Sequence, residues 1–171
     1  LFPRYLRDKH AIVTEEVDIF VLKDTIITVH NNELPVFEEL KNALKKPTKE
    51  TAALTKAAPL LLLEILDRLI DYCGPILVHL QNDIDAQERR VQRHFNEIDV
   101  ISTSMLRRNV VAFRRAFAPS AHALEHLQHT LTNTSSRSRS SLAKRVALRF
   151  ECVIDKTNEV LLLLGDYASA I

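Results

Sequence analysis

The chain has 171 residues, and its 23 basic and 22 acidic side chains leave a formal net charge of +1. This balance argues against a general binder of nucleic acids or of membrane surfaces, because both need a basic excess. Two cysteines and two glycines are too few for a disulfide-stabilised secreted domain, or for a barrel or sandwich with glycine-rich turns. We therefore expect a soluble, mainly helical protein of a reducing compartment. The first residue is Leu1 rather than a methionine, so we expect a fragment of a longer protein.

The N-terminal part, residues 1–48, is predicted to contain a β-hairpin and a helix. Residues 1–10 show no clear period, and we expect them to be irregular. Residues 11–22 are rich in β-branched side chains, and Val17, Ile19 and Val21 alternate with Asp18, Phe20 and Leu22, which predicts a strand. After a short polar turn, residues 25–30 are predicted to form the second strand of the hairpin.

This hairpin is predicted to be apolar on both faces. A lone two-stranded hairpin is only marginally stable in water, so we expect further strands of the sheet to lie upstream, outside this chain. Asn31 and Asn32 are predicted to cap a helix over residues 35–45, in which Pro35 suits the first turn.

A long helix is predicted from about Lys49 onward, with one continuous apolar seam over residues 59–91. Gly74 and Pro75 interrupt this helix, and because proline removes one backbone hydrogen bond we expect a kink there, after which the helix continues. At about 100° per residue, the members of the seam lie within about 40° of one direction: Leu62, Leu69, Cys73, Leu80, Ile84 and Val91.

A second long helix is predicted over residues 98–131, with another kink at Pro119. The seam of the second helix is formed by Leu106, Val110, Phe113, Phe117, Leu124 and Leu131.

A polar, flexible linker is predicted over residues 132–141, followed by a last helix over residues 142–171. Leu148 and Leu162 lie opposite the main apolar face of this helix, and a helix with two apolar faces favours contact with a partner chain. The main face comprises Leu142, Val146, Phe150, Val153, Val160 and Leu164.

Asp67 and Asp71 lie one turn apart, on the side of the first long helix that is opposite its apolar seam. Two carboxylates at this spacing repel each other unless a cation lies nearby. The cation can be a basic side chain or a metal ion, and Mg²⁺ is commonly held by one or two carboxylates plus water. A merely solvated face is the alternative, and it applies equally to Asp155 with its neighbours Glu151 and Glu159.

Three histidines, His122, His126 and His129, share the outer face of the second long helix. Such spacing can place two imidazoles on one zinc ion. Arg108 and Arg115 lie on the same face, so a basic stripe that meets acidic partners is an equal interpretation. The sequence shows no phosphate-binding loop, zinc signature or recognisable nucleophile, and we predict that the chain is not an enzyme.

Five motifs follow one another in a characteristic order: Thr28-Val29-His30, LLLEILDRLIDY over residues 61–72, the acidic run 82–85, a doubled basic motif (Leu106-Arg107-Arg108, then Phe113-Arg114-Arg115 and Pro119), and FECVIDKT over residues 150–157. Together they resemble the cytoplasmic part of CorA-type magnesium and divalent cation transporters, over about residues 15–171.

The resemblance implies an α/β sandwich domain, of which residues 1–48 form a partial αβα sandwich. It also implies a pair of long antiparallel helices over residues 49–131, and a stalk helix that begins with residues 142–171 and leads into two membrane spans. It also implies a homopentamer on the cytoplasmic side of the inner membrane, in which Mg²⁺ between subunits keeps the pore closed. We expect this chain to be the regulatory domain of a transporter for Mg²⁺, Co²⁺ or Zn²⁺, with the spans and pore outside it. No nucleic-acid partner is expected, and the membrane is expected to be reached only through those spans.

The candidate metal ligands are Asp67, Asp71, Glu151, Cys152 and Asp155. By resemblance, Asp67 matches a family carboxylate in the inter-subunit metal region, and Asp155 matches the second acid of the stalk motif. Cys152 replaces the first acid of that motif, and the histidine after the second acid is replaced by a lysine at position 156. Because a thiolate prefers a softer metal such as zinc, zinc or no metal at all are alternatives to Mg²⁺ at this place.

A helical adaptor or coiled-coil assembly protein without a metal role is the alternative function, because long apolar seams also bind partner helices. Two apolar spans of roughly 20 residues each, directly after residue 171, would favour the transporter.

Overall fold

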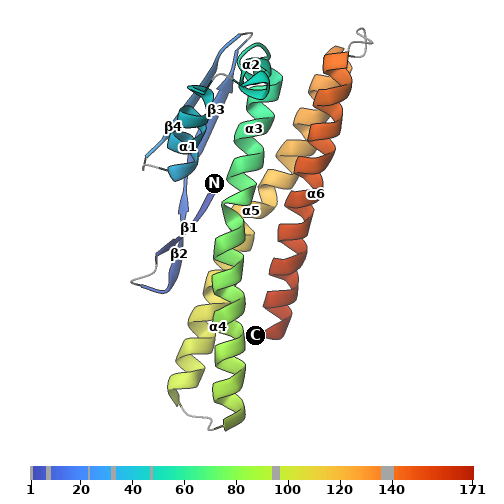
Figure 1. Cartoon of the computed structure of the whole chain (residues 1–171). Helices are drawn as coiled ribbons and strands as arrows, with labels where there is room; N and C mark the ends of the chain where they lie inside the picture. Colours follow the sequence, from blue (N-terminus) through green and yellow to red (C-terminus); the bar gives the residue numbers. More distant parts are fainter. Residues whose placement is uncertain are drawn as a thin grey trace.

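The computed structural model describes residues 2–6, 9–22, 24–31, 34–46, 48–93, 97–135 and 141–171 (Figure 1). Two short antiparallel hairpins lie beside three long helical rods, which are α3 followed by α4, then α5, then α6. The predicted α+β, predominantly α fold is confirmed. In chain order the elements are β1 (Phe2–Leu6), β2 (Ala11–Glu15), β3 (Val17–Val21), β4 (Ile26–His30), α1 (Pro35–Leu44), α2 (Lys49–Leu54), α3 (Ala58–Asp71), α4 (Cys73–Arg93), α5 (Glu97–Ser135) and α6 (Ser141–Ala170).

The strands pair as β1 with β2 and β3 with β4, both antiparallel. The predicted hairpin is found as β3–β4. The expectation that residues 1–10 are irregular is wrong over β1, because pairing with β2 supplies order that no local period reveals. The single strand predicted over residues 11–22 is in fact divided at Glu16 into β2 and β3, which belong to different sheets.

The two faces of the β3–β4 hairpin differ in exposure. Ile19 and Ile26 are partly buried and pack against the core, whereas Phe20, Ile27 and Val29 are 56%, 48% and 51% exposed. The sheet is therefore covered by helices on one face within the described residues. The further upstream strands concern residues outside this chain and stay a prediction.

Helix α1 begins at Pro35, as predicted, and buries Val36 and Leu40. The predicted cap at Asn31 is wrong, because the N-cap residue is Leu34, whose side chain makes no capping hydrogen bond; Asn32 lies outside the described residues. Leu34 is 1% exposed, so burial of an apolar side chain anchors this helix start. Proline at the first position removes one donor that would otherwise need a partner.

Helix α2 starts at the predicted place because two threonines cap it. The Thr51 amide donates to Thr48 Oγ1 at 3.1 Å, and the Thr48 amide donates to Thr51 Oγ1 at 2.9 Å, which is the reciprocal arrangement of a capping box. The helix expected to continue from here is interrupted over residues 55–57 before α3 begins.

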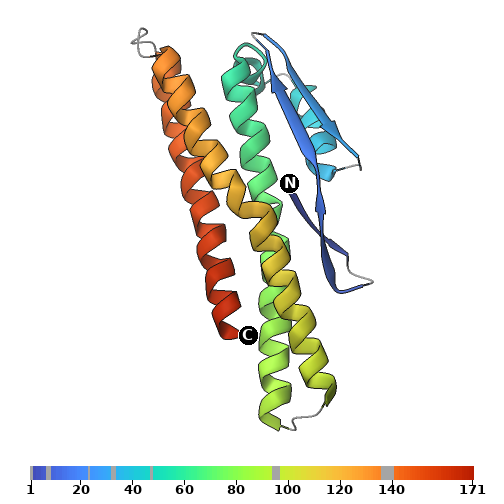
Figure 2. The same ribbon diagram turned by 180° about the vertical axis from the view of Figure 1, so that it is seen from behind.

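Helices α3 and α4 follow one another along one direction, as both views show (Figures 1 and 2). The kink predicted at Gly74 and Pro75 is displaced, because the interruption lies at Tyr72 and α4 begins at Cys73. Pro75 thus lies in the first turn of α4, where its missing N–H needs no acceptor. The apolar seam is buried across the interruption except at Val91, which is 40% exposed.

Helix α5 runs antiparallel to α3 and α4, and α6 runs antiparallel to α5 (Figure 2). Pro119 lies inside α5, which continues through it. Because α5 extends to Ser135, the first part of the predicted linker is helical, and residues 136–140 lie outside the described residues. On α6 the predicted main face is buried except at Leu142, which is 40% exposed.

The core lies between the three rods. Its largest fully buried side chains include Phe113 and Phe117 of α5 and Phe150 of α6. The rings of Phe113 and Phe117 meet edge to face with their centroids 6.0 Å apart, a favourable aromatic geometry. This core holds α6 against both α3 and α5, which positions the charged side chains described next.

Candidate functional site

Asp67 and Asp71 of α3 share one cation, and it is the side-chain ammonium of Lys156 on α6. Lys156 Nζ donates hydrogen bonds of 2.6 Å to Asp67 Oδ1 and of 2.8 Å to Asp71 Oδ1. The spacing of the two aspartates places both carboxylates on one side of α3, and α6 runs beside α3 (Figure 1). We call these three side chains the Lys156 clamp.

The Lys156 clamp lies at the edge of the helix interface. The side chains of Asp67, Asp71 and Lys156 are 25%, 59% and 39% exposed. Burial acts to lower the pKa of Lys156, but its hydrogen bonds to Asp67 and Asp71 outweigh burial and raise that pKa above its ordinary value. The ammonium is therefore charged at neutral pH, and the clamp carries one surplus negative charge.

A second ion pair joins α3 and α6 about two helical turns before the Lys156 clamp on both helices. We call the clamp and this second pair the two ion-pair levels. Glu64 of α3 accepts hydrogen bonds from Arg149 Nη2 of α6 at 2.8 Å and from Arg68 Nε at 2.7 Å. Burial acts to raise the pKa of Glu64, but the two arginines outweigh it and hold that pKa below its ordinary value. The two levels together set the register of α6 against α3.

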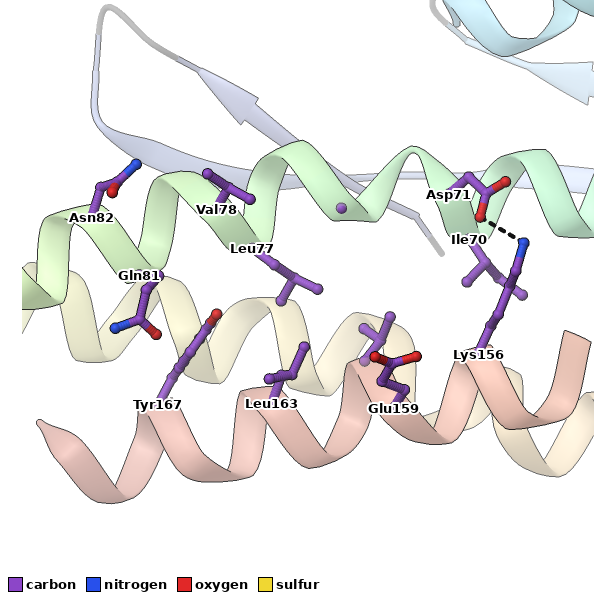
Figure 3. A pocket seen from close by; sticks show the side chains of 12 residues that line it. Ile70, Asp71, Leu77, Val78, Gln81, Asn82, Lys156, Glu159, Leu163 and Tyr167 are labelled. Atoms are coloured by element: carbon purple, nitrogen blue, oxygen red, sulfur yellow. Dashed lines mark hydrogen bonds and ion pairs between the residues drawn. The ribbon is translucent and has the colours of Figure 1, made fainter.

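A groove of about 470 Å³ runs beside the clamp between α4 and α6. Figure 3 shows Leu77 and Leu163 pointing toward one another across it, while Lys156 reaches Asp71 at one end. Tyr167 of α6 lies at the other end. We call this the α4–α6 groove, lined among others by Asp71, Leu77, Gln81, Lys156, Leu163 and Tyr167.

The remaining candidate metal ligands, Glu151, Cys152 and Asp155, are all exposed on α6. Cys152 is a free thiol. Within the described parts of the chain, no group of three or more His, Cys, Asp or Glu side chains is arranged to hold a metal ion. A metal role for these three residues stays a prediction.

The histidines His122, His126 and His129 lie on the exposed side of α5. His122 Nδ1 is 3.8 Å from a carboxylate oxygen of Glu125. Arg108, which the sequence places on the same face, is exposed as well. The side chains of the predicted basic stripe are therefore exposed and accessible to an acidic partner.

The two cations of α6 that pair with the acids of α3 were not predicted from the sequence. Arg149 and Lys156 are separated along α6 by the same interval that separates Glu64 from Asp71 on α3. That matching interval is the signal in the sequence, because helices packed in parallel bring positions of equal spacing together.

A second polar cluster joins the β1–β2 hairpin to α5 and was not foreseen either. Asn109 is 6% exposed; its side chain accepts a hydrogen bond of 3.1 Å from the Ile12 amide and donates one of 2.7 Å to the His10 carbonyl. His10 has φ of 44°, a left-handed conformation that side chains other than glycine seldom adopt. Asn109 thus fixes the hairpin turn on the helical core.

Among the helices of the described residues, none combines the length and the apolar character needed to cross a bilayer.

No curated protein matches the sequence. The family model described as CorA-like Mg²⁺ transporter protein matches residues 2–171. Its members are transporters, which agrees with the prediction that the chain is not an enzyme. A match over nearly the whole chain shows that this chain belongs to the CorA-like Mg²⁺ transporter family.

Proposed function

We propose that this chain is the cytoplasmic regulatory domain of a transporter for Mg²⁺ or a related divalent cation, and that the Lys156 clamp couples cation binding to the position of α6. One observation supports this proposal above all. In a chain of a Mg²⁺ transporter family, two carboxylates of one helix hold a positive charge that belongs to another helix.

A divalent cation and Lys156 compete for the same two carboxylates. The ammonium balances one of the two negative charges, whereas a divalent cation balances both and accepts carboxylate oxygens with water completing its shell. At high cation concentration, Asp67 and Asp71 bind the cation and release Lys156. At low concentration, Lys156 returns and ties α6 to α3.

This competition gives α6 two states, and a ligand that prefers one state shifts the population toward it. In the released state α6 keeps the Glu64–Arg149 level and its apolar core face but loses the clamp. We propose that α6 is the stalk that carries this change toward the membrane in a homopentameric transporter. The ion pair of Arg149 with Glu64 is therefore kept in both states, whereas the contacts of Lys156 with Asp67 and Asp71 are made in only one of them.

The exposed side chains Glu151, Cys152 and Asp155 extend the proposal to a neighbouring subunit. They point away from the chain's own core, so a metal bound there would need further donors from a second copy. A thiolate at Cys152 shifts the preference of such a site toward Zn²⁺ or Co²⁺ rather than Mg²⁺.

The test is a titration of Mg²⁺, Co²⁺ and Zn²⁺ at constant ionic strength, followed by melting temperature. A ligand that binds only the folded state stabilises it in proportion to the logarithm of its concentration. We expect a modest rise for the natural chain. The melting temperature of Lys156→Met should be lower than that of the natural chain without cation, because the clamp is lost. It should rise further with Mg²⁺, because Asp67 and Asp71 are left without a competitor.

Two variants complete this experiment. Asp67→Asn/Asp71→Asn should lose the Mg²⁺ response, while Arg149→Met should keep it, because Arg149 belongs to the other ion-pair level. If the natural chain and Asp67→Asn/Asp71→Asn respond equally to every cation, these residues do not sense cations. The clamp would then only join two helices, as in the alternative of a helical assembly protein.

A further inference from the structure

Histidines gather on the outer side of the second half of α5. Three of the chain's seven histidines lie within residues 122–129, at positions 122, 126 and 129. All three are exposed, and on a helical wheel they lie opposite Leu124, which is 5% exposed and belongs to the core. Their imidazoles are therefore accessible from solvent and are not needed for packing.

Two of these histidines, His122 and His126, are separated by one helical turn. Side chains four residues apart on a helix are neighbours, with about 5–6 Å between their Cβ atoms. Zinc-binding helices use this spacing, because two imidazoles on one face can then reach the same ion. The order His, Glu, His over residues 122–126 also matches the H-x-x-E-H helix of some zinc peptidases, although the pair lies here on an exposed surface.

The charges near this pair favour a cation. Glu125 lies next to His126, and its carboxylate oxygen is 3.8 Å from Nδ1 of His122. A carboxylate beside a ligating imidazole orients the ring and makes it more basic. Arg115 is separated from His122 by about 10 Å of helix, which is about one Debye length at 0.1 M salt, so its repulsion is largely screened.

Small uncharged residues leave room for an ion and its water. The His122 side chain leans over the preceding turn of α5, and that turn presents Ala118 and Pro119. Exposed side chains change rotamer within picoseconds to nanoseconds. The two imidazoles can therefore turn toward one ion without any movement of the helix backbone.

We propose that His122 and His126 form a binding site for a transition-metal ion such as Zn²⁺ or Ni²⁺, with Glu125 as the adjacent carboxylate and water as the remaining ligands. Imidazole suits these ions, whereas carboxylate and water suit Mg²⁺. The site therefore differs in chemistry from the Lys156 clamp, and it does not depend on the function proposed for that clamp.

The position of the pair gives the site a structural effect. Pro119 lies inside α5, and it lacks the N–H that would otherwise bond the carbonyl of Arg115. The turn that holds His122 and His126 follows directly after this weakened place. An ion that binds both imidazoles only when this turn is helical stabilises it. Because α5 packs against α6, the bound ion should also stabilise that packing.

Isothermal titration calorimetry tests the site in the 171-residue chain. All variants carry Cys152→Ser, so that the exposed thiol does not bind the metal. We expect Zn²⁺ and Ni²⁺ to bind, and His122→Asn and His126→Asn each to weaken this binding at least about tenfold, because one of two protein ligands is lost. In NMR spectra, Zn²⁺ should shift the ring signals of His122 and His126 before those of His79, and hydrogen exchange over residues 122–126 should slow.

A matched control keeps the number of histidines but changes their spacing. Ala121→His/His122→Ala places the imidazole five residues before His126, about 140° around the helix, and it should bind as weakly as His122→Asn. A second control, His129→Asn, should bind like the parent chain. Binding that survives His122→Asn and His126→Asn, or that survives the change of spacing, would overturn the proposal, as would an equal loss in His129→Asn.

The two metal proposals can fail separately. Asp67→Asn/Asp71→Asn should keep Zn²⁺ binding at the histidine pair, because those carboxylates belong to α3. His122→Asn should in turn keep the Mg²⁺ response of the Lys156 clamp. A loss of Zn²⁺ binding at the histidine pair in the aspartate variant would contradict an independent site on α5.

Discussion

Glu64 on α3 accepts a hydrogen bond of 2.8 Å from Arg149 on α6, and this ion pair is the more buried of the two levels that join these helices. The side chain of Glu64 is 14% exposed, whereas that of Asp71 at the other level is 59% exposed. Ionic interactions weaken with exposure because water and salt screen them. The two levels should therefore respond differently to pH, to salt and to substitution.

Acid should remove the contribution of Glu64. Its pKa is subject to burial, which raises it, and to the hydrogen bonds from Arg149 and Arg68, which outweigh burial and lower it below its ordinary value of 4.5. The folded chain therefore binds this proton more weakly than the unfolded chain. The stabilisation is present above about pH 4.5 and is lost as the pH falls through the lowered pKa.

We expect Glu64→Gln to lower the free energy of unfolding by about 1 kcal/mol at neutral pH, a value reduced for the partial exposure of both arginines. Urea denaturation at about pH 7 and about pH 3.5 should show this difference shrinking in acid. Glu38→Gln, in a pair whose side chains are both more than 60% exposed, is the control and should change little. A difference that stays constant with pH would contradict the role of the Glu64 charge.

Salt should weaken the Lys156 clamp. A double-mutant cycle of Lys156→Met and Asp67→Asn should give a coupling free energy of about 0.5–1 kcal/mol at low salt, because both side chains are partly exposed. In about 1 M NaCl the coupling should fall, since the Debye length shortens to about 3 Å. The exposed pair of Lys41 and Glu38 provides a reference cycle with a coupling near zero. A clamp coupling that is indifferent to salt would contradict an electrostatic contact.

The two thiols should differ in reactivity. Cys73 is buried, and burial together with the charge of Asp71 raises its pKa to about 12; Cys152 is exposed. Because the thiolate is the reactive form, an aromatic disulfide reagent should titrate one thiol rapidly in the folded chain and two in denaturant. The Cys152→Ser chain should then show no rapid reaction, and rapid reaction of Cys73 in that variant would contradict the packing of α4.

Removal of the Asn109 side chain should loosen the β1–β2 hairpin. Asn109→Ala leaves the Ile12 amide and the His10 carbonyl without their partner, which should cost about 2 kcal/mol of stability. Hydrogen exchange of the Ile12 amide should accelerate at the same time. Asn158→Ala, at an exposed position of α6, is the matched control; equal effects of the two substitutions would contradict the anchoring role.

The long helices were predictable because helical periodicity is a local property. Leu80 and Val110 are fully buried, as the seams predict, since the spacing of apolar residues decides which side of a helix faces the core. The β3–β4 hairpin was predictable for the same reason, from alternation. By contrast, β1 was not predicted, because this strand of five residues is ordered by its pairing with β2 rather than by an alternation of side chains in its own sequence.

For the candidate site, the sequence by itself determined that Asp67 and Asp71 share one side of a helix and repel each other unless a positive charge lies nearby, because side chains one turn apart are neighbours whatever the rest of the chain does. Only the tertiary structure decided that Lys156, 89 residues from Asp67, supplies that charge. Which faces of α3 and α6 meet depends on how the whole core packs. The spacing within a single helix does not contain that information, so it leaves the identity of the cation open.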